Sequence, residues 1–145
     1  MKADNTLKMT FPSRSANEGF ARSAVAAFIA QLDPTLGELA DIKTAVSEAV
    51  TNCIVHAYPG SVGIVYITVG LYPGGKVRIR VADKGVGIPD VAHAMEPMVT
   101  GGGEERTGLG FTVMQTFMDR LTVRSAPGRG TVVVLEKNLT QRSES

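Results

Sequence analysis

The sequence predicts an α+β fold, a two-layer α/β sandwich with helices on one face of a mixed, mostly antiparallel sheet. Two amphipathic helical segments come first, at residues 16–31 and 35–57. Two hairpin-like strand pairs follow, at 64–81 and 121–136, with one more helical segment between them. Helices that cluster early and strands that pair as hairpins do not form the strand–helix alternation of a parallel sheet, so two layers are favoured.

Length and composition limit the function classes. The 145 residues form one domain, which we place at 1–145, with 43% hydrophobic residues, 20% charged residues and a formal charge of +1. The basic residues are dispersed along the sequence, which argues against direct nucleic-acid binding. The sequence has no apolar run of about 20 residues, no apolar signal region, and only one cysteine. We therefore expect a cytoplasmic protein that contacts neither membrane nor nucleic acid directly.

The first half is predicted as a strand followed by two helices. The strand is expected at 7–11, and Ser15 and Glu18 have the spacing of a capping box that would begin the first helix. Its inward face is expected to be Phe20, Ala24, Ala27 and Phe28. The second helix carries apolar residues at helical spacing: Leu36, Leu39, Ile42, Val46, Val50, Cys53 and Ala57.

The second half is predicted as two hairpins around a glycine-rich lid and a helix. Clusters of Pro and Gly mark the two hairpin turns, at 72–75 and 127–130. The elements in order are strands 64–71 and 76–81, a lid at about 90–107, a helix at about 109–119, strands 121–125 and 131–136, and a polar tail at about 140–145.

Glu48, Asn52 and His56 are spaced four residues apart on the second helix, so they share one stripe. A solvated face would explain such a pair, but Asn is a poor helix-interior residue and here it has apolar neighbours. An Asn side-chain oxygen can bind Mg²⁺, and a Glu one turn away can accept a proton from an attacking hydroxyl. We expect His56 to pack or cap the helix end, and Cys53 to fill the core.

Asp83 lies where a strand ends, and Gly85 and Gly87 follow in a turn. Two interpretations are open: the glycines serve only to allow positive φ, or they also let the backbone approach a ligand. A carboxylate at this point can accept a hydrogen bond from an exocyclic amine such as that of adenine. The segment lacks the further acidic residues of a calcium loop, and the chain has no Gly-Lys-Ser/Thr phosphate loop.

Residues 101–110 are rich in glycine and lead into a helix. The free amides of a helix N-terminus bind phosphate, and Gly108 and Gly110 would allow close approach of the backbone. Arg106 could pair with a phosphate oxygen. A flexible surface loop is the alternative. The ordered combination favours a nucleotide site, because Mg-ATP needs base recognition, a metal ligand and a phosphate cradle together.

These motifs resemble the N, G1 and G2 boxes of the GHKL ATPase/kinase superfamily, at 48–58, 83–89 and 108–111. Within it, residues 15–52 and the continuation 111–114 are similar to the anti-sigma F factors of endospore-forming bacteria. The resemblance implies a Bergerat-type sandwich and a homodimer with ATP or ADP and Mg²⁺ as cofactors. It also implies two activities: binding and inhibition of a sporulation sigma factor, and serine-kinase phosphorylation of an anti-anti-sigma protein, which inactivates that antagonist.

By position, the resemblance implies that Glu48 is the catalytic base and Asn52 the Mg²⁺ ligand. Asp83 would bind the adenine amine with help from Thr131, and Arg22 on the first helix would face the protein partners. The remaining nucleotide-binding residues implied are Gly85, Gly87, Arg106, Gly108 and Gly110.

The lid departs from the family pattern, because the chain has three glycines at 101–103 where relatives usually carry a lysine and a proline. This removes one candidate phosphate contact and predicts a looser lid. Two other functions stay open. One is a sister anti-sigma kinase that serves a stress-response sigma factor, and the other is a nucleotide-gated binding module without phosphotransfer. Glu48 argues against the second, since binding alone needs no base.

Overall fold

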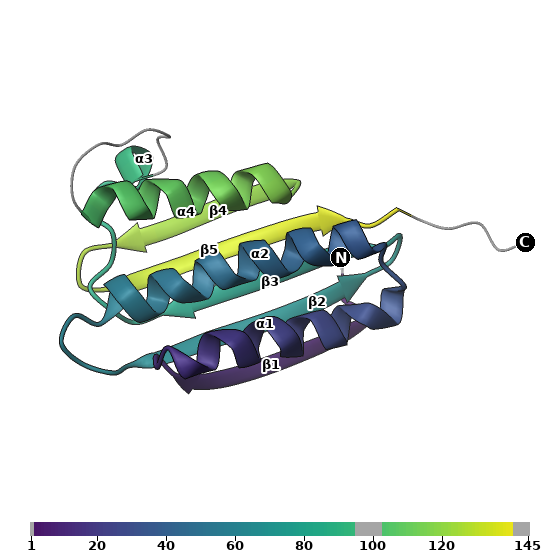
Figure 1. Ribbon diagram of the computed structural model, residues 1–145, viewed down its shortest axis with the longest axis horizontal. Helices are drawn as coiled ribbons and strands as arrows, with labels where there is room; N and C mark the ends of the chain where they lie inside the picture. The colour runs from purple at the N-terminus through teal and green to yellow at the C-terminus, as the bar shows by residue number, and fades with distance from the viewer. Residues whose placement is uncertain (1, 95–102, 141–145) are drawn as a thin grey trace, which may run out of the picture.

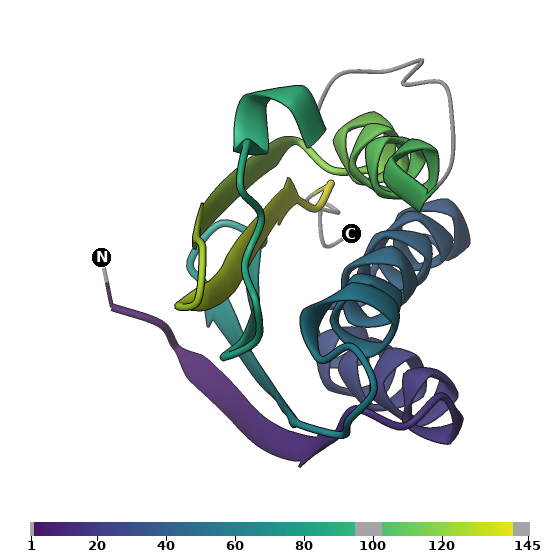
Figure 2. The same cartoon turned by 90° about the vertical axis from the view of Figure 1, so that its left-hand side faces the viewer.

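The computed structural model of the protein is a two-layer α+β sandwich (Figure 1). The structure describes residues 2–94 and 103–140, without the side chains of 92, 93 and 103–109. Three helices lie side by side on one face of a five-stranded sheet, and Figure 2 shows the two layers edge-on. The elements in order are β1 (Asn5–Pro12), α1 (Ala16–Ile29), the 3₁₀ turn η1 (Ala30–Leu32), α2 (Leu36–Asn52), the π-helical turn η2 (Cys53–Ala57), β2 (Ile64–Tyr72), β3 (Lys76–Asp83), α3 (Val91–Ala94), α4 (Gly103–Phe117), β4 (Arg120–Ala126) and β5 (Gly130–Asn138).

The sheet has the strand order β1-β2-β3-β5-β4, and each of its four strand pairs is antiparallel. The two predicted hairpins are confirmed, at β2–β3 and β4–β5. Gly74 and Gly75 have positive φ in the first turn, and Gly128 and Gly130 in the second, which explains the glycines there. Because β5 pairs with β3, the start of β5 lies beside the end of β3, where Asp83 is opposite Thr131.

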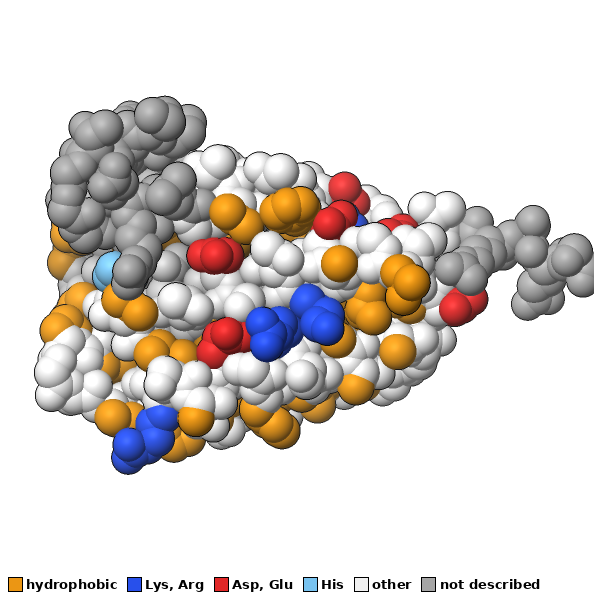
Figure 3. All heavy atoms as spheres, viewed as in Figure 1, with side chains coloured by type: hydrophobic (Ala, Val, Ile, Leu, Met, Phe, Trp, Pro, Cys, Tyr) orange, Lys and Arg blue, Asp and Glu red, His pale blue; other side chains and the backbone are white. Residues whose placement is uncertain are grey.

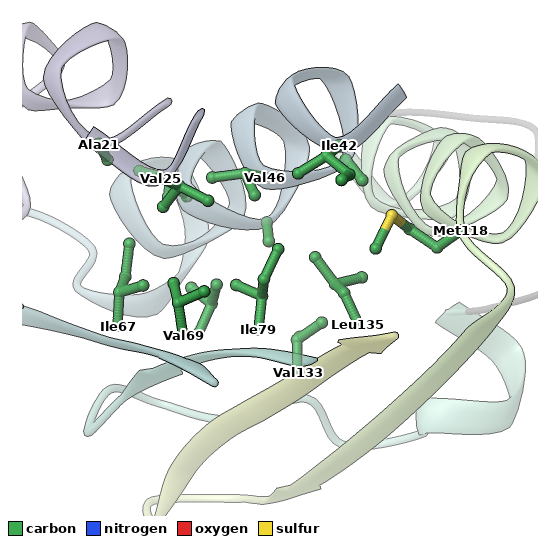
Figure 4. Packing of buried hydrophobic residues seen from close by; sticks show 14 of the residues in the cluster. Ala21, Val25, Ile42, Val46, Ile67, Val69, Ile79, Met118, Val133 and Leu135 are labelled. Atoms are coloured by element: carbon green, nitrogen blue, oxygen red, sulfur yellow. The ribbon is translucent and has the colours of Figure 1, made fainter. Parts of the chain in front are cut away.

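The core lies between the helices and the inward face of the sheet (Figure 4). Ile42 and Val46 on α2 pack toward Ile79 and Leu135, one each from β3 and β5. The predicted stripe on α2 is confirmed from Ile42 onward, but Leu36 at its first turn is 88% exposed.

The predicted inward face of α1 is only partly right, because Phe28 is partly buried against the core but the fully buried positions are others. Ala21, Val25, Ala26 and Ile29 are buried, whereas Phe20 is 60% exposed. Alanines and bulky residues occur on both faces of this helix, so its periodicity alone did not choose between them. Packing against α2 and β1 decides the face.

The predicted capping box at the start of α1 is also wrong. Ser15 already has helical φ and ψ and makes no side-chain cap bond, while Glu18 forms an ion pair with Arg22 at 3.7 Å. A capping box does begin α2. Thr35 Oγ1 accepts from Glu38 N at 3.0 Å, and Thr35 N donates to Glu38 Oε1 at 2.9 Å.

The opposite face of the sheet carries no helix among the described residues. A hollow there is lined by Lys8, Arg80, Lys84 and Arg129, with Lys84 over the ring of Tyr66. Basic residues that are dispersed in the sequence therefore gather on one surface. No helix of the described residues is long and apolar enough to cross a membrane.

Candidate functional site

A mostly apolar cavity of about 240 Å³ lies between the C-terminal end of the α2–η2 helix, the sheet and α4. Its wall includes Asn52, His56, Asp83, Phe111 and Thr131. The cavity therefore brings together residues from all three sequence motifs, although these motifs are far apart in the chain, as Asn52 and Phe111 are. A pocket with few polar groups on an apolar wall is typical of a small-molecule site.

Asp83 ends β3 at the inner end of the cavity and is 8% exposed. Its Oδ1 accepts hydrogen bonds from Gly85 N at 2.9 Å and from Thr131 N at 3.2 Å, which stabilise the carboxylate. Its Oδ2 accepts from the Cys53 thiol at 3.5 Å. With Oδ1 held by two backbone amides, Oδ2 is the oxygen left with lone-pair capacity for a ligand.

Gly85 and Gly87 are required by the packing of the chain on itself. A Cβ at Gly85 would clash with the carbonyl group of Ala57 at the end of η2, and one at Gly87 would clash with the carbonyl group of Ala126. Gly87 also has φ +79°. The positive φ expected of a glycine is found at Gly87, while close approach of the backbone to a ligand stays a prediction. The close approach that the structure shows is to the chain itself. The approach is to the helix end and to the β4–β5 hairpin.

Glu48 and Asn52 meet α4 at Gly110. A Cβ on Gly110 would lie 3.3 Å from Glu48 Oε2 and 3.4 Å from Asn52 Nδ2, so the glycine lets α4 approach this pair. The Asn52 amide has a buried Nδ2 without a hydrogen-bond partner among the described residues. An orphaned amide on a cavity wall fits a ligand oxygen at Nδ2, and after a flip of its O and N atoms it would also fit a metal ion.

The residues that sequence reasoning gave to the phosphates are only partly described. The helix expected to begin at about residue 109 begins at Gly103, so Gly108 lies inside α4 and does not open it. The side chain of Arg106 and most of the predicted lid, at 95–102, lie outside the described residues. Within the described part of the lid, α3 is a single short turn beside the cavity.

A second hollow adjoins Glu48 on the outer surface of the helices. It is lined by Arg22, Lys43, Thr44 and Ser47 as well as Glu48, between α1 and α2. Figure 3 shows basic and acidic side chains side by side in the middle of this face. Arg22 is thus placed on the same surface as the predicted base.

Sequence reasoning missed two side chains that organise the site. Tyr58 OH donates to Ile64 O at 2.7 Å and accepts from Lys84 N at 2.8 Å, which ties the helix end to two strands. Ser125 contacts Thr131 across the β4–β5 hairpin. The hairpin register around the 127–130 turn could have identified that pair. Cys53 is buried in the core as expected, but it also donates to Asp83.

His56 lies in η2 and lines the cavity. The turn from Cys53 to Ala57 is π-helical, although the sequence had predicted one continuous helix to residue 57. π-Helical turns occur frequently at functional sites. Here the turn lets Asn52, Cys53 and His56 all reach the same cavity wall.

Comparison with known proteins adds the family context. Residues 11–137 match the family described as "Histidine kinase-like ATPase domain". The chain is 56% identical over 138 residues to an anti-sigma F factor of Thermoanaerobacter sp. (strain X514), covering 94% of this chain and 96% of the relative. It is 52% identical to the anti-sigma F factor of Clostridium kluyveri (strain ATCC 8527) over 92% and 94% of the two chains.

Solved structures give the same fold. The RsbU and RsbW domains of Rv1364c from Mycobacterium tuberculosis superpose with a TM-score of 0.68 at 20% identity, covering 93% of this chain and 32% of that one. Full-length ShkA in complex with AMPPNP superposes with a TM-score of 0.56 at 22% identity, covering 88% and 31%.

Proposed function

The chain belongs to the anti-sigma F factors, within the histidine kinase-like ATPase domain family, and from this premise we propose that it is a protein-serine kinase with two protein partners. It binds and inhibits sporulation sigma factor F, and it uses Mg-ATP to phosphorylate and inactivate an anti-anti-sigma protein. It acts in the cytoplasm as a homodimer. The printed names of the relatives support the sigma-factor partner, and the geometry of the cavity supports the chemistry.

The observation that carries the proposal is the convergence of Glu48, Asn52 and Gly110 beside a cavity that ends at Asp83. Asp83, the inner carboxylate, lines the cavity, and Glu48, the outer carboxylate, lies near Asn52 where α2 meets Gly110, so the two can supply separate functions. The inner carboxylate can bind the adenine base of a nucleotide, and the outer carboxylate can accept a proton. A binding module without phosphotransfer would need only the first.

Base recognition is proposed for the inner end. The adenine amine donates to Asp83 Oδ2, and the adenine ring packs against the apolar wall of the cavity. Thr131 adds a second polar contact. Gly85 and Gly87 shape this end by allowing the helix end and the hairpin to close around it.

Phosphoryl transfer is proposed for the mouth of the cavity. Asn52 would hold Mg²⁺ through its side-chain oxygen, and the ion would neutralise charge on the phosphates when bound. Glu48 accepts the proton of the substrate serine hydroxyl. The serine oxygen then forms a bond to the γ-phosphorus, the bond from that phosphorus to the bridging oxygen breaks, and ADP leaves. Arg106, Gly108 and Gly110 are proposed to hold the phosphates, under the lid at about 90–107.

The hollow beside Glu48 is proposed to receive protein partners. Arg22 and Lys43 give it two cations within reach of an acidic segment, and its continuity with Glu48 leads a serine to the base. Arg22 is half-exposed and pairs with Glu18. An ion pair of this kind, between surface residues four apart on a helix, contributes little free energy. A partner carboxylate can therefore compete for it.

The deciding experiment incubates the protein with labelled ATP and the candidate anti-anti-sigma protein, with and without Mg²⁺. We expect label on a serine of the partner only when Mg²⁺ is present. Glu48→Gln should keep ATP affinity within about twofold and reduce transfer by about 10²–10⁴-fold, the usual contribution of a general base. Transfer at the normal rate by this variant would refute the base assignment.

Asp83→Asn tests the adenine site. Oδ1 must still accept from Gly85 N and Thr131 N, so the new NH₂ group would take the place of Oδ2 and face the adenine amine with a donor. We expect ATP affinity to fall at least about tenfold, because a hydrogen bond to a charged group is lost. Unchanged affinity in a calorimetric titration would exclude Asp83 as the base-binding residue.

Arg22→Ala tests the partner surface. ATP affinity should be unchanged, and binding of the sigma factor should weaken, as measured by calorimetry with each candidate sigma factor in turn. Tighter binding of a stress-response sigma factor than of sigma F would favour the sister-kinase alternative. Light scattering at several protein concentrations would test the homodimer.

A further inference from the structure

Ser125 on β4 lies directly opposite Thr131 on β5, one residue from the cavity wall. Its hydroxyl oxygen is within hydrogen-bond distance of three groups: Ile88 N at 2.7 Å, Gly130 O at 2.9 Å and Thr131 Oγ1 at 2.8 Å. Ser125 itself is not among the residues that line the cavity. Its three partners all belong to the loop and strand that form the inner end of the cavity.

The proton count fixes the direction of each bond. A serine hydroxyl has one proton and two lone pairs. Ile88 N–H occupies one lone pair, and the single proton is donated to Gly130 O. The remaining contact must therefore use the second lone pair of Ser125, so that Thr131 donates its proton to Ser125.

This direction controls what Thr131 can offer a ligand. With its only proton committed to Ser125, the Thr131 hydroxyl has only lone pairs left for the cavity. Asp83 Oδ2 is likewise an acceptor, because a carboxylate oxygen has only lone pairs to offer, and the other oxygen, Oδ1, is already held by Gly85 N and Thr131 N. The two polar groups at the inner end are thus both acceptors.

We propose that Ser125 is a specificity-determining positioning residue, which fixes Thr131 as an acceptor and so selects a purine with a 6-amino group over one with a 6-oxo group. An exocyclic amine has two N–H donors, one for Asp83 Oδ2 and one for Thr131 Oγ1. A 6-oxo group brings a third acceptor to the same place, so neither Asp83 Oδ2 nor Thr131 Oγ1 receives a proton from it. The inference rests on the proposed ATP site and names the residue that sets its base selectivity.

Ser125 also anchors the loop through Ile88 N, and a purely structural role has a different signature. Loss of the anchor alone would weaken every nucleotide by the same factor, because the cavity would loosen for all of them. The second link between hairpin and loop, from Gly128 N to Val86 O at 2.7 Å, does not depend on Ser125 and should keep the fold intact in Ser125→Ala.

The experiment measures ATP and ITP affinities by calorimetry, with Mg²⁺, for the full chain and for Ser125→Ala, Thr131→Val and the double variant. In Ser125→Ala the Thr131 hydroxyl can rotate and donate to the 6-oxo group. We expect the ATP-over-ITP preference to fall by about fivefold, the usual worth of one hydrogen bond. In the Thr131→Val background the added Ser125→Ala change should leave the preference as it is, because the two residues act through one hydroxyl.

Equal weakening of both nucleotides by Ser125→Ala, or the same drop in preference in both backgrounds, would overturn the inference. If Ser125→Ala does not fold, Thr131→Val decides alone: it should weaken ATP and not ITP, and a greater loss for ITP would show that Thr131 is a donor. Absence of ATP binding by the unmodified chain would instead refute the proposed function. An unchanged ATP affinity in Thr131→Val would refute only the inference.

Discussion

Replacing Gly85 by alanine tests whether the loop after β3 needs a glycine for close packing. A Cβ there would lie 2.5 Å from the carbonyl carbon of Ala57, where ordinary contacts begin at 3.4 Å. The loop or the end of η2 must therefore move by at least about 0.9 Å, the difference of these two distances, because the carbonyl oxygen of Ala57 is nearer still. The movement overpacks the junction and weakens the hydrogen bond from Val86 N to Ala57 O, now 2.8 Å. We expect the free energy of unfolding to fall by about 2–4 kcal/mol.

Gly74→Ala is the matched control. Gly74 has φ +82° with no atom within 4 Å of a built Cβ, whereas Gly85 is not among the glycines with positive φ. The control should cost only the backbone strain, about 1–2 kcal/mol, and should leave ATP affinity unchanged, since its turn is at the other end of the β2–β3 hairpin from Asp83. Equilibrium urea unfolding and ATP titration measure both quantities. The close-packing argument would fail if Gly85→Ala lowered the free energy of unfolding no more than Gly74→Ala did, or if the Gly85→Ala protein bound ATP with normal affinity.

Three further predictions concern α4, the helix cap and the thiol. Gly110→Ala should leave the free energy of unfolding unchanged or higher, because alanine favours the helix. The new methyl group, 3.3 Å from Glu48 Oε2, should slow phosphoryl transfer about tenfold. An unimpaired transfer rate would contradict this prediction. Thr35→Ala should cost about 1 kcal/mol in urea unfolding, and Ser15→Ala almost nothing, since only the first makes a cap bond; equal costs would be the contrary result. Burial, and then the neighbouring Asp83 carboxylate, raise the pKa of the Cys53 thiol. At pH 8–9 the thiol of the folded protein should therefore react with a disulfide reagent at least about tenfold more slowly than that of the urea-unfolded protein. Equal rates in the two states would count against this.

The predictable parts of the fold are those whose signals are local. Pro and Gly at 72–75 and 127–130 marked both hairpin turns, because positive φ favours glycine regardless of what surrounds it. The spacing of Glu48 and Asn52 placed them on one stripe, because an α-helix fixes that geometry by itself. The stripe of α2 from Ile42 onward followed from periodicity for the same reason.

Other features depended on contacts between distant segments. The face that α1 buries is set by packing, since the local pattern allowed more than one answer. The roles of Gly85 and Gly87 became clear only when the helix end and the hairpin were seen to press against their backbone.

The sequence by itself determined the α+β class, the order of the elements and the set of residues able to handle a nucleotide, because turn chemistry, helical period and side-chain type are local properties. The tertiary structure alone decided how these residues are joined. The antiparallel pairing of β5 with β3 brings Thr131 to Asp83, and the hairpin brings Ser125 to Thr131. Hydrogen-bond direction depends on every partner at once, so the base selectivity proposed for this site is a property of the fold and not of any single motif.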